Sequence, residues 1–204
     1  ERFTKQKCQM NYPRNSIDFC LNFAGLKPNN LDVIAIVSKN DLMEQNLVNR
    51  IDTFSIKDFL SEQYDYWKPV IYEKKKVDYL EVFKHKINLK QDFDFREFLR
   101  LRKKLKTSLF NPIHSRNYRK EEIKIFTKMR IKTIQKHLKI KDKNKIIHIE
   151  HEKGHQYYGL FAAPKNFRKK CLVLTNEGMG DKSNLTVSVV RNGKMKELFY
   201  SKKC

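Results

Sequence analysis

The chain has 204 residues and a mass of 24.6 kDa, enough for one domain or one lobe of a larger one. Its composition is 40% hydrophobic and 12% aromatic, which excludes a disordered chain. No apolar run reaches the roughly eighteen residues of a membrane span, and no secretory signal opens the chain. We therefore expect a cytoplasmic protein without a membrane partner.

The positive charge, +21 with a pI near 9.8, has two interpretations. Dense lysine and arginine bind nucleic acid by releasing its counterions. However, lysine, isoleucine, asparagine and phenylalanine are abundant together, as expected from an AT-rich genome, and the basic residues are spread along the whole chain. The second interpretation is favoured, so nucleic acid stays an alternative partner and is not the favoured one.

The four cysteines show neither a CxxC spacing nor the pattern of a disulfide framework, which is typical of reduced thiols. This usage agrees with a cytoplasmic location. Cys20 and Cys171 have apolar neighbours, so both are predicted to lie in the core.

The first part of the chain alternates a helix with a strand. Apolar residues at spacings of three and four predict an amphipathic helix with Asn15 as its N-cap and Gly25 as its end. The apolar run Leu31–Val37 then predicts a short buried strand. This order of elements is typical of an α/β fold.

The middle of the chain is predicted to be mainly helical. Ser55, with Asp58 three residues later, predicts a helix that runs toward Trp67 until Pro69 interrupts it. Residues 70–115 mix aromatic side chains with basic clusters and are interpreted as helical insertion material, and the insertion as a whole spans about residues 40–120.

The last part returns to helices and strands in alternation. Asn192-Gly193 supplies the two residues that a type I′ hairpin turn requires. The other predicted elements are a helix over 119–138, a strand over 146–149, a helix over 151–163 ended by Pro164, a strand over 171–174, and hairpin strands over 185–190 and 195–200.

His151 and His155 give the sharpest local signal. Residues four apart lie on one face of a helix, so two imidazoles can share a divalent metal ion. The pair directly follows a predicted strand, and open α/β sheets bind ligands at the carboxyl ends of their strands. Gly154 is unfavourable inside a helix, which the close approach of another group would explain. The alternative is a pair of surface histidines, because this spacing arises often by chance.

The segment Leu174–Asp181 is the second candidate. A strand that ends in Glu177, followed by Gly178 and Gly180, lets backbone N–H groups approach a phosphate, with the acid placed to hold a metal. Glu177 follows His155 by 22 residues, enough for a helix, a loop and a strand that returns beside the first. Glu177 is therefore a candidate third ligand, although many ordinary tight turns also contain Gly-x-Gly.

Basic residues near the start of the chain form the third candidate. Arg2 and Lys7 lie in the segment Glu1–Lys7, just before a predicted helix. They can bind an acidic ligand there, Arg2 through its bidentate guanidinium. A solvated charged loop is the alternative.

In their order and spacing, these segments resemble the O-carbamoyltransferase family of the nodulation-protein and antibiotic-tailoring type. The resemblance covers both ends of the chain and hardly covers residues 40–120. The matching segments are Glu1-Arg2-Phe3-Thr4-Lys5-Gln6-Lys7, Tyr12-Pro13, Leu21-Asn22-Phe23-Ala24-Gly25, Asp32-Val33, His151-Glu152-Lys153-Gly154-His155 and Leu174–Asp181.

The resemblance implies an actin/hexokinase-like, ribonuclease-H-like α/β lobe, of which we expect this chain to be an N-terminal fragment. The rest of the same polypeptide is then an expected partner. Carbamoyl phosphate and ATP would give carbamoyl-adenylate, whose carbamoyl group passes to a hydroxyl of a sugar or natural product. A metal, most readily iron, would bind His151, His155 and Glu177. Substrate phosphate would contact the basic and glycine positions Arg2, Lys7, Gly178 and Gly180, and no residue is assigned as catalytic.

Three residues depart from the family pattern. Glu152 replaces the second histidine, Glu177 replaces an aspartate, and Cys8 replaces a common histidine. Glu177 can still bind a metal through a side chain one methylene longer. The departures indicate a divergent member of the family.

Two alternative functions stay open. The related tRNA threonylcarbamoyl transferases share the lobe and a His-x-Glu-Gly-His motif, but the first segment and the turn near Gly178 fit the O-carbamoyltransferases better. A non-catalytic nucleic-acid-binding module, whose affinity would fall steeply with salt, would instead use the basic cluster Arg100, Arg102, Lys103, Lys104 and Lys106.

Overall fold

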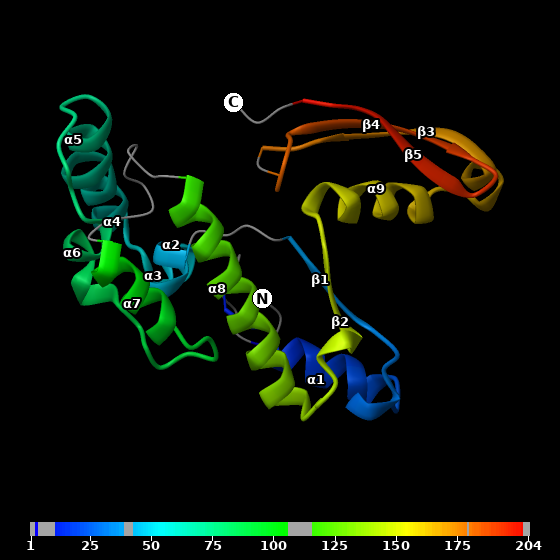
Figure 1. Ribbon diagram of the computed structural model, residues 1–204, viewed down its shortest axis with the longest axis horizontal. Coiled ribbons are helices and arrows are strands. Elements are labelled where there is room, and N and C mark those ends of the chain that lie inside the picture. Colours follow the sequence, from blue (N-terminus) through cyan, green and yellow to red (C-terminus); the bar gives the residue numbers. More distant parts are fainter. Residues whose placement is uncertain (1–2, 4–10, 39–42, 106–115, 179, 202–204) are drawn as a thin grey trace. The chain divides into compact units, whose positions relative to one another are not determined.

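The computed structural model describes residues 3, 11–38, 43–105, 116–178 and 180–201, and it is a mixed α/β structure, which confirms the predicted class (Figure 1). The chain separates into two compact units. Unit 1 comprises Glu1–Asp32 and Asp41–Lys143, and unit 2 comprises Val33–Asn40 and Asn144–Cys204. The strands found among the described residues all belong to unit 2.

The first helix, α1 (Arg14–Phe23), starts earlier than predicted. Pro13 and not Asn15 is the N-cap, because the Pro13 carbonyl already accepts the Ile17 N–H at 3.0 Å. The positive φ of Gly25, 64°, confirms the predicted end. No residue of α1 is buried, and its apolar side chains lie mainly toward solvent. The prediction that Cys20 lies in the core was therefore wrong.

The helix predicted after Ser55 is present and longer than expected. The Ser55 hydroxyl accepts the Asp58 N–H, and the Asp58 carboxylate accepts the Ser55 N–H at 2.7 Å, which confirms the predicted start. Pro69 does not interrupt it: α4 (Ile56–Ser61) continues through a π-helical segment (Glu62–Trp67) into α5 (Lys68–Ile71). The change of hydrogen-bond pattern before Pro69 accommodates a residue that has no N–H to donate.

The long helix α8 (Arg116–Leu138) confirms the helix predicted over 119–138. Aromatic side chains dominate the core of unit 1, and the largest fully buried ones include Tyr66, Tyr79, Phe83, Phe95 and Phe98. No helix among the described residues is long and apolar enough to cross a membrane. The other helical elements of unit 1 are 3₁₀ Pro28–Asn30, α2 (Met43–Leu47), α3 (Arg50–Thr53), α6 (Tyr79–Val82), 3₁₀ Lys84–Lys86 and α7 (Arg96–Leu105), and the 3₁₀ turn Lys143–Lys145 spans the boundary with unit 2.

Buried ion pairs fasten the helices of unit 1 together. Glu62, with no exposed side-chain surface, accepts hydrogen bonds from Arg50 Nε at 2.7 Å and Arg50 Nη2 at 2.6 Å. It also accepts the Tyr79 hydroxyl at 2.6 Å; burial, and then this bond, raise the pKa of Tyr79. Arg102 is likewise buried, 2.7 Å from Glu44 and in contact with Asp78. Arg102 is therefore not open to nucleic acid, which weakens the basic cluster proposed from the sequence.

Unit 2 contains two separate sheets. β1 (Ile34–Val37) pairs in parallel with β2 (Ile146–Ile149), as expected for strands separated by a long helical crossover. β3 (Lys170–Asn176), β4 (Leu185–Arg191) and β5 (Lys194–Tyr200) form an antiparallel sheet in that order. The prediction that the strand before Glu177 returns beside the first was wrong, because β3 pairs with β4 and begins a new sheet.

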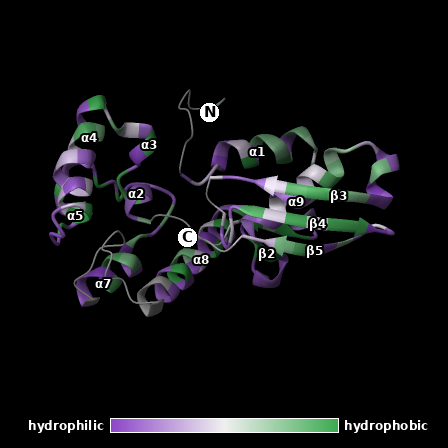
Figure 2. Cartoon of the chain, turned by 90° about the horizontal axis from the view of Figure 1, so that it is seen from above, coloured by the Kyte–Doolittle hydropathy of each residue, from purple (hydrophilic) through white to green (hydrophobic). Residues whose placement is uncertain are grey.

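Helix α9 (His151–Ala162) lies along one face of the three-stranded sheet (Figure 1). Leu160 of α9 packs against Val173 and Val190, and the half-buried Cys171 packs against this cluster. The predicted hairpin turn is confirmed, since Asn192 and Gly193 have φ values of 51° and 72°. Figure 2 shows the apolar character of β3 and β4. One covered face requires only alternate apolar residues, so the exposed Leu172 and Leu174 of β3 are apolar beyond that requirement.

Candidate functional site

Three side chains converge at the start of α9. The Nε2 atoms of His151 and His155 lie 2.9 Å apart. Glu177 Oε2 lies 2.6 Å from His151 Nε2 and 3.2 Å from His155 Nε2. Each residue thus brings one potential ligand atom to the same point.

Two loops of unit 2 set these positions. β2 ends at Ile149 and α9 begins at His151, so the histidines occupy the first two turns, one above the other. Glu177 directly follows β3, and its N–H donates to the Asn184 carbonyl at 2.9 Å, which closes the loop before β4. The carboxyl ends of β2 and β3 therefore supply the cluster.

The loop after Glu177 is held against α9 by Glu152. This side chain is buried, and its Oε1 accepts the Ser183 N–H at 2.8 Å and also the Lys182 N–H. A Cβ at Gly180 would overlap the Ser183 carbonyl and lie 2.7 Å from Glu152 Oε1 and 2.9 Å from Glu177 Oε1. Only glycine fits at this crowded point, so Gly180 has a steric role that Gly178, with open space around it, does not share.

Two further contacts fix the start of α9. Asp181 Oδ2 accepts the His151 backbone N–H at 2.9 Å, where the helix dipole favours an anion. Asp181 Oδ1 accepts the Ser38 hydroxyl at 3.0 Å, which joins the end of β1 to the same point. A Cβ on Gly154 would lie 2.8 Å from Val37 Cγ1, so the glycine predicted to allow a close approach does allow one, by β1.

Carboxylates outnumber cations around the cluster, although the chain as a whole carries +21. Glu150 pairs with Lys182 at 2.6 Å and with Lys153 at 3.8 Å. The hydrogen bond to Glu150 raises the pKa of Lys182, which therefore stays charged. Among the described residues, neither lysine nor arginine forms an ion pair with Glu177.

The donor set fits a divalent metal. Two imidazole nitrogens and one carboxylate oxygen match the two-histidine, one-carboxylate group that binds iron(II) and leaves positions open. Ligand atoms about 2.1 Å from an octahedral ion lie roughly 3 Å apart, close to the observed separations. Glu177 Oε1 is buried and has no hydrogen-bond partner among the described residues. Nitrogen and oxygen lone pairs that lie this close need a proton or a cation between them.

The structure thus brings together His151, His155 and Glu177, three residues selected from the sequence. Arg2 and Lys7 lie outside the described residues. The sequence did not reveal the role of Glu152 or Asp181, since a short-range pattern carries no signal of contacts across 30 residues. In the sequence, Glu152 was noted only as the residue that replaces the family's second histidine.

Comparison with known proteins assigns the chain to a family. The family model described as the carbamoyltransferase N-terminus matches residues 1–202, and so includes His151, His155 and Glu177. No curated protein matches the chain. The family description names carbamoyl transfer, so the protein is a transferase, as predicted from the sequence. Because the match extends over nearly all 204 residues, the chain belongs to the carbamoyltransferase N-terminal family.

Proposed function

We propose that the protein activates a carbamoyl group with ATP and passes it to a hydroxyl of a sugar or natural product. The convergence of His151, His155 and Glu177 is the observation that supports this proposal most directly. In balanced form, carbamoyl phosphate and water give carbamate and phosphate. Carbamate and ATP then give carbamoyl-adenylate and pyrophosphate, and the acceptor hydroxyl releases AMP. The proposed setting is an actin-like lobe in a cytoplasmic enzyme.

Each residue of the cluster has a proposed role. His151 and His155 would bind the metal, proposed to be iron, through Nε2, and Glu177 through Oε2. The metal would offset the negative charge of the adenylate phosphate. Asp181 and Glu152 orient these ligands by holding the start of α9 and the loop at 180–183. Arg2, Lys7, Gly178 and Gly180 are proposed to contact phosphate groups.

Two observations make the alternatives weaker. The family match favours a transferase over a nucleic-acid-binding module, and Arg102 is engaged in buried ion pairs. The tRNA-modifying alternative rested on a His-x-Glu-Gly-His motif. In this chain lysine (Lys153) stands where that motif has its glutamate, and Glu152 instead accepts the backbone N–H groups of Lys182 and Ser183.

The test is pyrophosphate release by the purified protein with ATP and carbamoyl phosphate, alongside elemental analysis of bound metal. His155→Ala is expected to reduce both the metal content and the release at least about a hundredfold, the scale of one lost electrostatic contact at a reacting centre. His85→Ala is the matched control, since His85 is also an exposed histidine but lies in unit 1. Unchanged metal content in His155→Ala would exclude the metal centre. No pyrophosphate release from the unaltered protein would exclude the adenylate route.

A further inference from the structure

The helical run from Ile56 to Tyr72 in unit 1 has its apolar side facing solvent. Its buried side carries Asp58, Glu62, Tyr66 and Val70, one at every fourth position. Its exposed side carries six large apolar or aromatic side chains, here called the 56–72 stripe. Their exposures range from half-buried Trp67 to 81% for Ile56, and they are Ile56, Leu60, Tyr64, Trp67, Ile71 and Tyr72. A helix of a soluble domain normally buries its apolar side.

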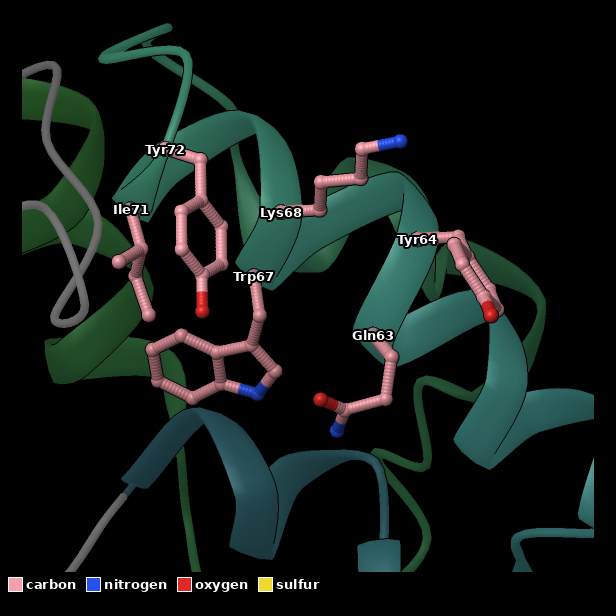
Figure 3. A pocket seen from close by; sticks show the side chains of 6 residues that line it. All are labelled: Gln63, Tyr64, Trp67, Lys68, Ile71 and Tyr72. Carbon is pink, nitrogen blue, oxygen red and sulfur yellow. The ribbon is translucent and has the colours of Figure 1, made fainter.

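The stripe contains a pocket of about 570 Å³. In Figure 3 the Trp67 indole lies between Gln63 and Ile71, with the Tyr72 ring directed toward it, while Lys68 and Tyr64 point away. A concave site of this size admits a large side chain. Tryptophan and tyrosine are enriched among the few residues that provide most of the binding energy at protein interfaces.

The backbone under the stripe also departs from a regular helix. Residues Glu62–Trp67 are π-helical, and π-helical turns occur frequently at functional sites. The stripe is about 24 Å long at the rise of a helix. Contiguous exposed apolar surface on this scale marks an interaction site more often than ordinary solvent-facing surface.

The charges beside the stripe indicate the nature of its partner. Lys57 and Lys68 are exposed next to it, and in the part of the chain that the structure describes neither forms an ion pair. Of the acids in the run, Glu62 is paired with Arg50 and Asp58 with Lys86, while the exposed Asp65 accepts a hydrogen bond from the Ser61 hydroxyl. A second copy of a chain that carries +21 would bring like charges together. An acidic partner would instead bring opposite charges together.

We propose that the 56–72 stripe binds an amphipathic helix of a partner protein that carries acidic residues beside its apolar face. One apolar side chain of the partner enters the Trp67 pocket, and others lie along Leu60 and Ile56 at helical spacing. The acidic residues pair with Lys57 and Lys68. This is the helix-in-groove mode of recognition, in which apolar anchors supply affinity and flanking charges supply specificity.

Trp67 is the single tryptophan of the chain and reports on the pocket directly. The probe is a synthetic helical peptide with leucines at spacings of three and four and glutamates on both flanks. The control peptide has lysine at each glutamate position. Titration of the 204-residue protein is expected to shift Trp67 emission with the glutamate peptide, at an affinity at least about tenfold higher than with the lysine peptide.

Three variants sharpen the test. Lys57→Glu combined with Lys68→Glu is expected to reverse the preference between the two peptides, which loss of folding cannot do. Leu60→Ser is expected to weaken binding about tenfold, and Leu172→Ser, another exposed leucine but in β3, to leave it unchanged. Equal binding of both peptides, or no response of Trp67 to either, would overturn the proposal. So would a Trp67 shift caused by phosphatidylglycerol vesicles alone, or a dimer dissociated by Leu60→Ser.

Discussion

Glu62 of unit 1 and Glu177 of unit 2 are both shielded carboxylates, with side-chain exposures of 0% and 14%. Glu62 receives two hydrogen bonds from Arg50 and one from Tyr79. Glu177 meets two imidazole nitrogens, and its second oxygen has no hydrogen-bond partner among the described residues. Burial of an unpaired carboxylate costs free energy, and the two regions offset that cost with different partners: a guanidinium at Glu62 and imidazoles at Glu177.

The difference separates a structural acid from a candidate ligand. The guanidinium of Arg50 is permanently charged and forms a bidentate pair, which leaves nothing further for Glu62 to bind. The imidazole nitrogens of His151 and His155 can instead donate an N–H to Glu177 or, without that hydrogen, offer a lone pair to a metal ion. Glu177 therefore has partners that can share a cation with it, whereas Glu62 does not. Stability should depend on the first arrangement and metal binding on the second.

Arg50→Ala is expected to give the largest loss of stability. It leaves Glu62 buried with only the Tyr79 hydroxyl, and breaking a buried ion pair in this way costs about 3–5 kcal/mol. Urea unfolding followed by Trp67 fluorescence measures it. Arg96→Ala breaks the exposed pair with Asp94 and should cost little, because solvent screens that pair. Glu177→Gln should also stay within about 1 kcal/mol of the unaltered protein, because no ion pair with lysine or arginine is lost. Equal losses for Arg50→Ala and Glu177→Gln would remove the distinction between the two regions.

Glu152→Ala should give the next largest effect. The substitution leaves the Lys182 and Ser183 N–H groups without their acceptor, at a cost of about 1–3 kcal/mol, and releases the loop that carries Glu177. Glu152→Gln keeps an oxygen acceptor in the same place and should retain most of the stability. Binding of Fe²⁺ or Co²⁺, followed by calorimetry, should weaken in Glu152→Ala and much less in Glu152→Gln. If both variants bind metal alike, the loop does not position Glu177.

Gly154→Ala tests the close packing beside the histidines. Alanine improves helix propensity by roughly 1 kcal/mol, but its Cβ would lie 2.8 Å from Val37 Cγ1. Overpacking of this kind costs about 1–3 kcal/mol, so a net loss of about 1 kcal/mol is expected. Val37→Ala in the same chain should restore stability, and the two changes should be strongly non-additive in unfolding experiments. Additive effects would mean that α9 and β1 are not in contact at this point.

Local patterns in the sequence predicted the local structure of both units well. The capping box at Ser55 and the Asn192-Gly193 turn depend on residues at most three apart, and both are present. The failures at Cys20 and Pro69 have another cause. Apolar neighbours in sequence do not determine whether a helix face is covered by other elements, and a change to π-helical hydrogen bonding is not visible in residue spacing.

Part of the candidate site was predictable because it also depends on short-range patterns. The histidine pair follows from helical spacing, and the acid at 177 from its place after a strand. The sheet arrangement was not predictable, because β3 could pair with β2 or begin a new sheet with an identical local pattern. Glu152 and Asp181 act across about 30 residues, and their contacts emerge only when the loop at 178–184 folds over α9. The sequence therefore identified the candidate metal ligands, but not Glu152 and Asp181, which position them.

The smallest expected effect concerns the pH dependence of unit 1. The hydrogen bond from the Ser55 hydroxyl, the largest cause, holds the pKa of Asp58 well below its ordinary value of 3.8. Because the folded pKa is the lower one, this stabilisation is fully present above about pH 5 and is lost as the pH falls below about 4. Asp58→Asn should cost about 1 kcal/mol at pH 7 through loss of the capping box, and progressively less in acid.

Asp94→Asn is the control variant. Arg96 lowers the pKa of Asp94 to about 2, but the pair is exposed, so solvent screening leaves little stability to lose. The free energy of unfolding of both variants in urea, measured at pH 7 and pH 3, distinguishes the capping carboxylate of Asp58 from the exposed, ion-paired carboxylate of Asp94. A constant deficit for Asp58→Asn at both pH values would show that charge contributes nothing at this cap.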